Sequence, residues 1–296
     1  MRLLVTGGSG FVGRHLVRRL AVENEVVTIQ RRIVAPSGPG VRDVELDLAE
    51  LTPAALAAAV GSIDVVIHLA ARLDNPFEVD RTLAELTPVN IVGTLRLLES
   101  SAELGIGRFV YGSTGGVGRN PPSGQRMFED DPAGPVNPYG LTKHLAEQAV
   151  LAYAWPFERV SLRYFAPYAR DGSNPLIHHV LGCLARGQEL MVGRDGGPEM
   201  NPIHIDDAVA ATVRATNAED LPRVINVAGP EVTTLAGMIR LLARAVGARP
   251  RIREETDLRP SWVADIERMQ RCLCAPTIGV ADGVEREWGG AIGTSR

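Results

Sequence analysis

Several features common in secreted, membrane-bound and metal-binding proteins are scarce in this sequence. It has three cysteines in 296 residues, and Cys272 and Cys274 have no second cysteine pair with which to complete a zinc site. We therefore expect no disulfide framework and no metal, and we interpret these two residues and Cys183 as buried or idle thiols in a reducing compartment. No apolar run approaches the roughly 18 residues of a membrane span. Residues 1–6 are followed by glycines rather than by a signal-peptide pattern, so we expect a cytoplasmic protein.

A strong charge of one sign is also absent. The net charge is −4 at pH 7, so nothing favours nucleic acid or an anionic membrane as a partner, and we expect neither. Hydrophobic residues make up 45% and charged residues 22%, which excludes a disordered chain and supplies a buried core. The length fits one large α/β domain, or one domain with a smaller lobe attached.

Short β-branched and leucine-rich runs alternate with helical patterns through the first half of the chain. The strands expected from them are Arg2–Thr6, Glu25–Gln30, Val41–Leu46, Ile63–Leu69, Arg108–Ser113 and Val160–Tyr164. The expected helices are Phe11–Ala21, Pro53–Val60, Ala84–Leu104 and one that begins near Pro138. This alternation predicts a doubly wound parallel sheet of the Rossmann type.

The rhythm breaks near Ala166, where proline and glycine become frequent and the helices and strands follow no regular order. We therefore expect residues 1–165 to form an NAD(P)-binding Rossmann domain, with a return segment near 203–227. Residues 166–296 are expected to form a smaller, substrate-binding lobe that packs closely against it, because no low-complexity linker separates the two.

Three glycines follow the first expected strand and precede a helix, namely Gly7, Gly10 and Gly13. In a dinucleotide site one such glycine permits the tight turn, one lets the backbone approach a pyrophosphate, and one lets helix and strand touch. A glycine pattern alone is weak, and a plain strand–turn–helix is the alternative. The position at the start of a βαβ unit favours a dinucleotide site.

The second expected strand ends in Gln30, Arg31 and Arg32. An NAD site usually has an acidic residue here that binds the ribose 2′-hydroxyl, whereas two arginines suit a 2′-phosphate. We therefore expect NADP(H) to be preferred, with NAD(H) possible. The alternative is that the arginines are merely solvated. Asp47 follows the third strand and is placed to meet the adenine.

Tyr139 and Lys143 share one face of the helix that begins near Pro138, because they are four residues apart. An ammonium beside a phenol favours the phenolate and lowers its pKa from about 10. Tyr139 is thus a candidate proton donor and acceptor for a carbonyl/alcohol pair. Ser113 and Thr114 end the preceding strand, whose carboxyl end opens onto the ligand crevice of such a sheet.

These motifs, taken together, resemble those of the extended short-chain dehydrogenase/reductase family, also called the NAD-dependent epimerase/dehydratase family. The resemblance covers nearly the whole chain. Its matching stretches are Thr6–Gly13, Asp47-Leu48, His68–Ala71, Asn90–Thr94, Ser113-Thr114, Glu129–Pro132, Pro138–Lys143, Leu162–Phe165, Ile203–Asp207 and Asn226–Gly229.

The resemblance implies a role for each matching residue. Thr114 would bond the substrate oxygen, Tyr139 would be the acid/base, and Lys143 would hold the nicotinamide ribose. The residues implied or expected to bind the cofactor are Gly7, Gly10, Phe11, Val12, Gly13, Arg31, Arg32, Asp47, Leu48, Leu69, Ala70, Ala71, Asn90, Tyr139, Lys143 and Tyr164. It also implies a homodimer paired through the helix of Tyr139 and the preceding long helix. His68 and His204 are interpreted as structural.

Some positions depart from the family pattern. Ala166 replaces a common asparagine, and Val117-Gly118-Arg119 replaces a common Val-Tyr-Gly. Gly115 and Gly116 stand where 4,6-dehydratases of the family have Asp-Glu, so that activity is not expected. Met200 occupies the place of an arginine that grips the substrate diphosphate. Either another cation, such as Arg194 or Arg259, has taken that role, or the substrate is not nucleotide-linked.

The sequence as a whole predicts an NAD(P)-dependent oxidoreductase, either a ketoreductase or an epimerase. It would transfer a hydride to or from a carbinol or keto carbon of a sugar-like substrate. A reductase of a non-nucleotide ketone is one alternative. Another is a non-catalytic NADP(H)-binding sensor on the same fold, although a sensor needs neither Tyr139, Lys143 nor Thr114.

Overall fold

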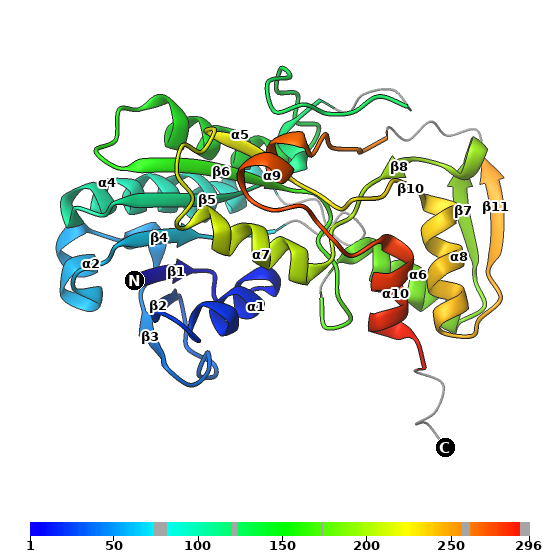
Figure 1. Ribbon diagram of the computed structural model, residues 1–296, viewed down its shortest axis with the longest axis horizontal. Coiled ribbons are helices and arrows are strands. Elements are labelled where there is room, and N and C mark those ends of the chain that lie inside the picture. Colours follow the sequence, from blue (N-terminus) through cyan, green and yellow to red (C-terminus); the bar gives the residue numbers. More distant parts are fainter. Residues whose placement is uncertain (74–81, 120–123, 173, 256–260, 291–296) are drawn as a thin grey trace.

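A seven-stranded, wholly parallel sheet forms the larger part of the protein in the computed structural model (Figure 1). The structure describes residues 1–73, 82–119, 124–172, 174–255 and 261–290. The strands, in spatial order, are β3 (Val41–Glu45), β2 (Glu25–Gln30), β1 (Arg2–Thr6), β4 (Val65–His68), β5 (Arg108–Thr114), β6 (Glu158–Tyr164) and β9 (Val224–Val227). The order reverses between β1 and β4, and such a switch point opens a ligand crevice at the carboxyl edge of a doubly wound sheet. The predicted fold class is confirmed.

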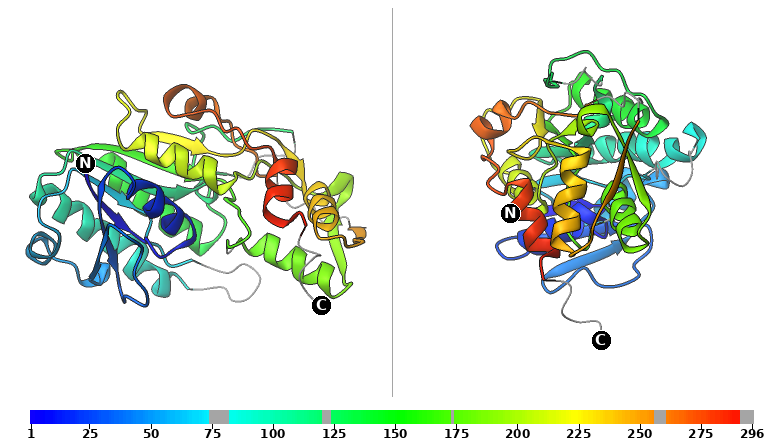
Figure 2. Two further views of the ribbon diagram at one scale, coloured as in Figure 1. Left: turned by 60° about the horizontal axis from the view of Figure 1, so that its bottom comes forward. Right: turned by 90° about the vertical axis from the view of Figure 1, so that its right-hand side faces the viewer.

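Helices cover both faces of this sheet (Figure 2). The apolar sides of α1 (Phe11–Leu20) and α7 (Ile205–Ala215) pack on one face. The other face is covered by α2 (Pro53–Val60), α4 (Thr94–Leu104) and α5 (Pro138–Ala152). In α1 the buried residues are Gly13, Leu16, Val17 and Leu20, which is the spacing of a helix with one apolar side.

The expected helix 84–104 is interrupted. It consists of α3 (Leu83–Thr87), a π-helical turn η2 (Pro88–Gly93) and α4. Pro88 has no backbone N–H and crowds the preceding turn, so the regular helical hydrogen-bond ladder cannot run through it. A wider turn absorbs the misfit. The remaining expected elements of the first half are present, with ends that differ by up to two residues.

A smaller part of the protein, here called the second lobe, lies at one end of the sheet, towards the right in Figure 1. Its helices and strands are α6 (Pro175–Ala185), β7 (Glu189–Gly193), β8 (Glu199–Met200), β10 (Thr233–Thr234), α8 (Leu235–Ala245), β11 (Arg251–Glu255) and α10 (Val280–Trp288). The apolar sides of α6, α8 and α10 share one core with β7. Between β8 and β10 the chain returns to the sheet as α7 and β9, and α9 (Glu267–Cys272) packs near β9.

The three cysteines are free. No group of three histidine, cysteine, aspartate or glutamate side chains suited to a metal ion is found in the described residues. None of the helices in these segments combines the length and hydropathy needed to cross a membrane.

Candidate active site

The turn between β1 and α1 needs its glycines for steric reasons. Gly7 has a φ of +72°, and a Cβ there would lie 2.6 Å from the Ala70 nitrogen. At Gly13 a Cβ would lie 2.0 Å from the carbonyl oxygen of Gly7. Gly10 begins α1 without a side-chain cap, and no acidic residue lies in the first turn. The free N–H groups of that turn are therefore available to an anion, which fits the pyrophosphate of a dinucleotide.

The first turn of α1 also contacts the segment after β6. A Cβ at Gly172 would lie 2.8 Å from the ring of Phe11. Next to it, Arg14 Nε donates to the Asp171 carboxylate over 3.1 Å, and His15 lies 3.1 Å from the same group. Phe11 is thus held from one side by protein, and half-buried Val12 packs against the core of the sheet. Phe11 and Val12, two of the predicted cofactor residues, thus both pack against neighbouring protein.

The residues expected around the adenosine lie at the ends of β2 and β3. Gln30 is buried, whereas Arg31 and Arg32 are exposed and form no ion pair with any described carboxylate. Asp47 accepts the Ala49 N–H over 2.9 Å and so caps the short helix η1 (Leu48–Glu50). Leu48 is buried, and a Cβ at Gly93 would lie 3.1 Å from it, so its side chain packs against the start of α4.

A buried chain of hydrogen bonds connects β1 with the helix that follows β4. The Thr6 hydroxyl, which accepts the Ala70 N–H, lies 2.6 Å from His68 Nδ1. On the other side of the ring, His68 Nε2 lies 2.8 Å from the Thr94 hydroxyl, which donates to the Asn90 carbonyl over 2.8 Å. His68 therefore donates from Nε2 and accepts at Nδ1. Burial, with a smaller contribution from the charge of Lys143, lowers its pKa to about 3, which agrees with a structural role.

Asn90 extends this network to α5. Its side chain accepts the Arg72 N–H over 2.7 Å and donates to the Arg72 carbonyl over 3.0 Å, which fixes the segment Leu69, Ala70, Ala71 after β4. It also donates to the Thr142 hydroxyl over 3.0 Å, and that hydroxyl donates to the Tyr139 carbonyl over 2.8 Å. The network thus reaches the backbone of the helix that carries Tyr139.

The start of α5, which carries Tyr139, closely approaches the turn that follows Thr114 at the end of β5. Asn137 caps α5 by accepting the Gly140 N–H over 2.7 Å. A Cβ at Gly140 would lie 2.4 Å from the carbonyl oxygen of Gly116, so only glycine allows the contact. The Thr114 hydroxyl accepts the Gly116 N–H over 3.2 Å, which leaves its own proton available to another acceptor.

The electrostatics of Tyr139 and Lys143 differ from the expectation. Burial raises the pKa of Tyr139 well above its usual value, so the predicted lowering by Lys143 is wrong for this structure. The Lys143 ammonium lies over the Tyr111 ring, 4.1 Å from its centroid. Burial lowers the pKa of Lys143 to about 7, and the charge of Glu147 opposes this shift. Lys143 therefore changes protonation close to neutral pH.

Glu147 was missed at the level of sequence. It lies one turn after Lys143 on α5, fully buried, and accepts from the Ser161 hydroxyl over 2.7 Å and from Arg163 Nη2 over 2.6 Å. Burial raises its pKa, but the hydrogen bond and charge of Arg163 outweigh this and leave the pKa below its usual value. The repeated spacing Tyr139, Lys143, Glu147 was the available signal, since all three lie on one side of a helix.

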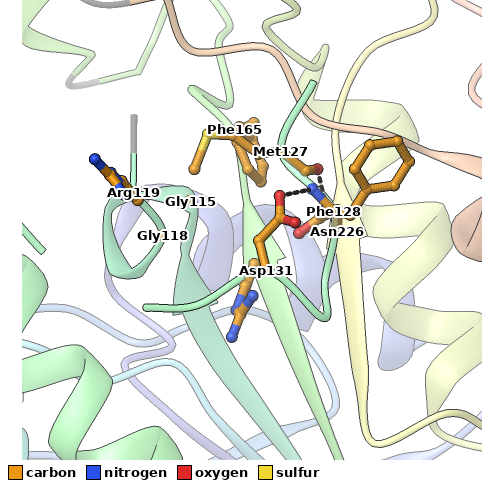
Figure 3. Close-up of a pocket in the computed structure, with 9 residues that line it drawn as sticks. Gly115, Gly118, Arg119, Met127, Phe128, Asp131, Phe165 and Asn226 are labelled. Atoms are coloured by element: carbon orange, nitrogen blue, oxygen red, sulfur yellow. Dashed lines mark hydrogen bonds between the residues drawn. The ribbon is translucent and has the colours of Figure 1, made fainter. Parts of the chain in front are cut away.

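A small pocket is lined in part by Gly115, the residue that follows Thr114 in the sequence (Figure 3). It is lined by Gly115, Gly118, Arg119, Met127, Phe128, Asp131, Arg163, Phe165 and Asn226. A Cβ at Gly115 would lie 2.6 Å from the Phe165 ring, so this wall has no room for a larger residue. Tyr164 was expected to bind the cofactor. Its hydroxyl instead lies 2.7 Å from the hydroxyl of Thr212 on α7, within the core.

Comparisons with known proteins agree with this arrangement. The sequence profile of the NAD dependent epimerase/dehydratase family matches residues 3–228. The chain belongs to this family. It is 29% identical to the UDP-glucose 4-epimerase of Mycolicibacterium smegmatis, over 90% of this chain and 88% of that protein. It is also 29% identical to the dTDP-6-deoxy-L-talose 4-dehydrogenase (NAD(P)(+)) of Kitasatospora kifunensis, over 86% and 81% of the two chains.

The family assignment extends to the three-dimensional structure. The UDP-glucuronic acid 4-epimerase of Bacillus cereus, solved with UDP-glucuronic acid and NAD, superimposes with a TM-score of 0.83 at 26% identity, over 97% of this chain and 98% of that one. This family member is therefore an NAD(P)-dependent enzyme of the extended short-chain dehydrogenase/reductase type, and its chemistry is hydride transfer on a sugar-like substrate. The interpretation as a non-catalytic sensor is not supported.

Proposed function

We propose that this enzyme transfers a hydride between C4 of a nicotinamide and a ring carbon of a nucleotide-linked sugar. The observation that supports this most is the meeting of three features at one edge of the sheet. These are the uncapped glycine turn before α1, the hydroxyl of Thr114 at the end of β5, and the start of α5 with Tyr139. The nucleotide is proposed because the relatives named above act on UDP- and dTDP-sugars.

Each residue of the site has a task in this proposal. Thr114 donates a hydrogen bond to the substrate oxygen, and Tyr139 gives or takes the proton of that oxygen as the carbon changes between alcohol and ketone. Lys143 binds the nicotinamide ribose in this proposal. The nicotinamide supplies or accepts the hydride when it is bound.

Whether the step is used once or twice decides the activity. A ketoreductase releases the product after one transfer, whereas an epimerase returns the hydride to the other face of the same carbon. The two activities can be separated by incubating the enzyme with UDP-glucose, UDP-glucuronic acid and a dTDP-4-keto sugar. The products are identified, and the absorbance of the reduced nicotinamide gives the amount of cofactor consumed per product. Epimerisation consumes no net nicotinamide, and reduction consumes one per product. Absence of both with every substrate contradicts the proposed chemistry.

The nucleotide must be held by groups other than Met200. That side chain is buried in the core of the second lobe and can neither donate nor accept a strong hydrogen bond. Arg194 is exposed on the turn η4 (Arg194–Gly196) and is the described candidate for the diphosphate, whereas Arg259 lies outside the described residues. Calorimetry with UDP, dTDP and GDP on cofactor-saturated enzyme tests this. Micromolar binding of one of them supports a nucleotide-linked substrate, and millimolar binding of all three favours a reductase of a non-nucleotide ketone.

The exposed pair Arg31 and Arg32 supports a preference for NADP(H) over NAD(H). A bidentate arginine–phosphate contact is worth a few kcal/mol at most, so a preference of roughly tens- to a thousandfold is expected. Titration of both cofactors against the wild type and an Arg31→Ala, Arg32→Ala double variant measures it. Equal affinity in the wild type would remove this part of the proposal.

The enzyme is also proposed to be a homodimer paired through α4 and α5. These helices carry exposed leucines, Leu95 with 37% and Leu145 with 46% of its surface accessible. Sedimentation of the wild type and of Leu145→Asp tests this, since the variant should shift towards a monomer.

The proposed cytoplasmic location is supported by the three cysteines, which are free thiols.

A further inference from the structure

A compact polar cluster lies under the loop that carries Arg31 and Arg32. Its centre is Asp43 of β3, and its other members are Thr28, Gln30 and Ser37. One carboxylate oxygen of Asp43 accepts from the Thr28 hydroxyl over 2.5 Å, the Gln30 amide over 2.8 Å and the Ser37 hydroxyl over 2.5 Å. The other oxygen accepts the Ser37 backbone N–H over 2.9 Å. This Asp43 cluster joins β2 and β3 to the middle of the loop between them.

The cluster needs an ionised carboxylate. Partial burial raises the pKa of Asp43, but the hydrogen bonds from Ser37, Thr28 and Gln30 outweigh it and lower the pKa below its usual value. An ionised carboxylate only accepts, so every group around it must donate, and the Gln30 amide is held with its nitrogen towards Asp43. Gln30 occupies the position at which an NAD site usually has a free acidic residue. Here the nearby acid, Asp43, is already occupied by four donors.

The loop of residues 31–40 is fastened to β3 at two points. Ser37 is held by Asp43, and the Ile33 N–H donates to the Glu45 carboxylate over 3.1 Å. β2 and β3 pair in register up to Gln30 and Glu45, so the loop leaves the sheet at its carboxyl edge. β1 pairs with β2 at the same edge and runs directly into Gly7. The two anchors therefore fix the backbone around Arg31 and Arg32 beside the glycine turn.

We propose that Asp43 is a positioning residue for the choice of cofactor, because it fastens Ser37 and Gln30 and thereby holds Arg31 and Arg32 ready for the 2′-phosphate of NADP(H). This inference rests on the proposed preference for NADP(H). It predicts that loss of the Asp43 carboxylate changes NADPH affinity in the direction opposite to that expected from charge alone. A negative charge near a phosphate opposes binding, so removal of that charge alone would strengthen NADPH binding. Removal of the anchor weakens it.

Asp43→Asn tests the proposal. The amide keeps one acceptor oxygen but turns an NH2 group towards donors that already point inward, so the cluster loosens. NADPH affinity should fall about three- to thirtyfold, the range of coupling between neighbouring groups, while NADH affinity stays unchanged. Fluorescence titration gives both dissociation constants. Tighter NADPH binding, or an equal loss for both cofactors, would show that Asp43 acts through its charge or through folding, and either result overturns the proposal.

Two further variants keep the test sharp. Ser37→Ala retains the charge of Asp43 and the backbone N–H bond to it but removes the hydroxyl bond, so it should weaken NADPH binding in the same direction by a smaller factor. Glu50→Gln, on the exposed end of η1, removes the same unit of charge outside the cluster and should leave the NADPH-to-NADH ratio unchanged. Both should fold if Asp43→Asn does not, and an unchanged ratio in Ser37→Ala contradicts the proposal.

A double-mutant cycle separates this inference from the function on which it rests. In the Arg31→Ala, Arg32→Ala background, Asp43→Asn should not change the ratio further, because the arginines are the groups that it positions. Equal binding of NADPH and NADH by the wild type would refute the cofactor preference itself. A preference in the wild type that survives in Asp43→Asn would refute only the role of Asp43.

Discussion

The ion pair of Glu147 and Arg163 tests how burial determines the contribution of an ion pair to the free energy of unfolding. Glu147 has no solvent-accessible surface, and the Arg163 side chain is 10% exposed. Arg163 also donates to the Glu129 carbonyl over 3.1 Å. Replacing Glu147 by glutamine would leave a buried guanidinium without a counter-charge. Breaking one side of such a pair costs about 3–5 kcal/mol of unfolding free energy, because the remaining charge stays desolvated.

The same sheet supplies a matched control. Arg108 and Glu158 pair across the amino ends of β5 and β6, with 3.0 Å between Arg108 Nε and the carboxylate, but the Glu158 side chain is 70% exposed. Water screens this pair, so Glu158→Gln should cost about 0–1 kcal/mol. Chemical denaturation of both variants at neutral pH gives the comparison. Equal losses in the two variants would refute the argument from burial.

The pH dependence of Glu147→Gln has a defined sign. The folded-state pKa of Glu147 is lowered, so its contribution to stability is present above the unfolded-state pKa of about 4.3 and is lost as the pH falls through the lower folded value. The difference between wild type and variant should therefore narrow in acid. The variant also loses the charge that raises the pKa of Lys143, so the pKa of that lysine should move further down. A difference in stability that persists unchanged below pH 3 would contradict this assignment.

Three other predictions concern the candidate site. Tyr139→Phe should lose nearly all turnover and keep its cofactor affinity, because the glycine turn supplies the phosphate contacts; wild-type rates at saturating substrate would remove Tyr139 from the mechanism. The pKa of Lys143 is about 7 in the fold and about 10.4 when unfolded, so it makes stability rise with pH between these values, and Lys143→Met should lack that rise in denaturation measured at pH 7, 8.5 and 10. No 4-keto-6-deoxy product should form from a nucleotide hexose, since Gly115 and Gly116 have no side chain to move a proton; its detection by mass spectrometry would contradict the assignment.

The sheet and its glycine turn could be predicted because their causes are local. Apolar runs such as that of β4 are buried on both faces, and the steric need for Gly7 and Gly13 follows from a backbone that must approach its neighbours closely. The arrangement of helices and strands in the second lobe could not be predicted from the sequence, because its short strands pair across long stretches of sequence, as β7 does with β11.

The electrostatics of the site could not be predicted, since they depend on what surrounds each group. Sequence spacing places Lys143 next to Tyr139 on one side of a helix, and this led to the wrong sign for the pKa of the tyrosine. Packing decides the outcome instead. The ammonium of Lys143 lies over the Tyr111 ring of β5, and burial raises the pKa of Tyr139. Arg163, on a different strand, fixes the charge of Glu147, and no local pattern encodes that contact.

The π-helical turn at Pro88 shows how a local misfit can serve the site. The sequence pattern predicted one helix through residues 84–104. The wide turn instead accommodates the missing N–H of Pro88, and it contains Asn90, whose amide contacts both the segment after β4 and Thr142 of α5. Such turns are rare and costly in a helix, and they persist where the surrounding structure holds them. Here His68, Thr94 and Asn90 supply that support, so the glycine turn, the end of β4 and the helix of Tyr139 are braced by one set of buried hydrogen bonds.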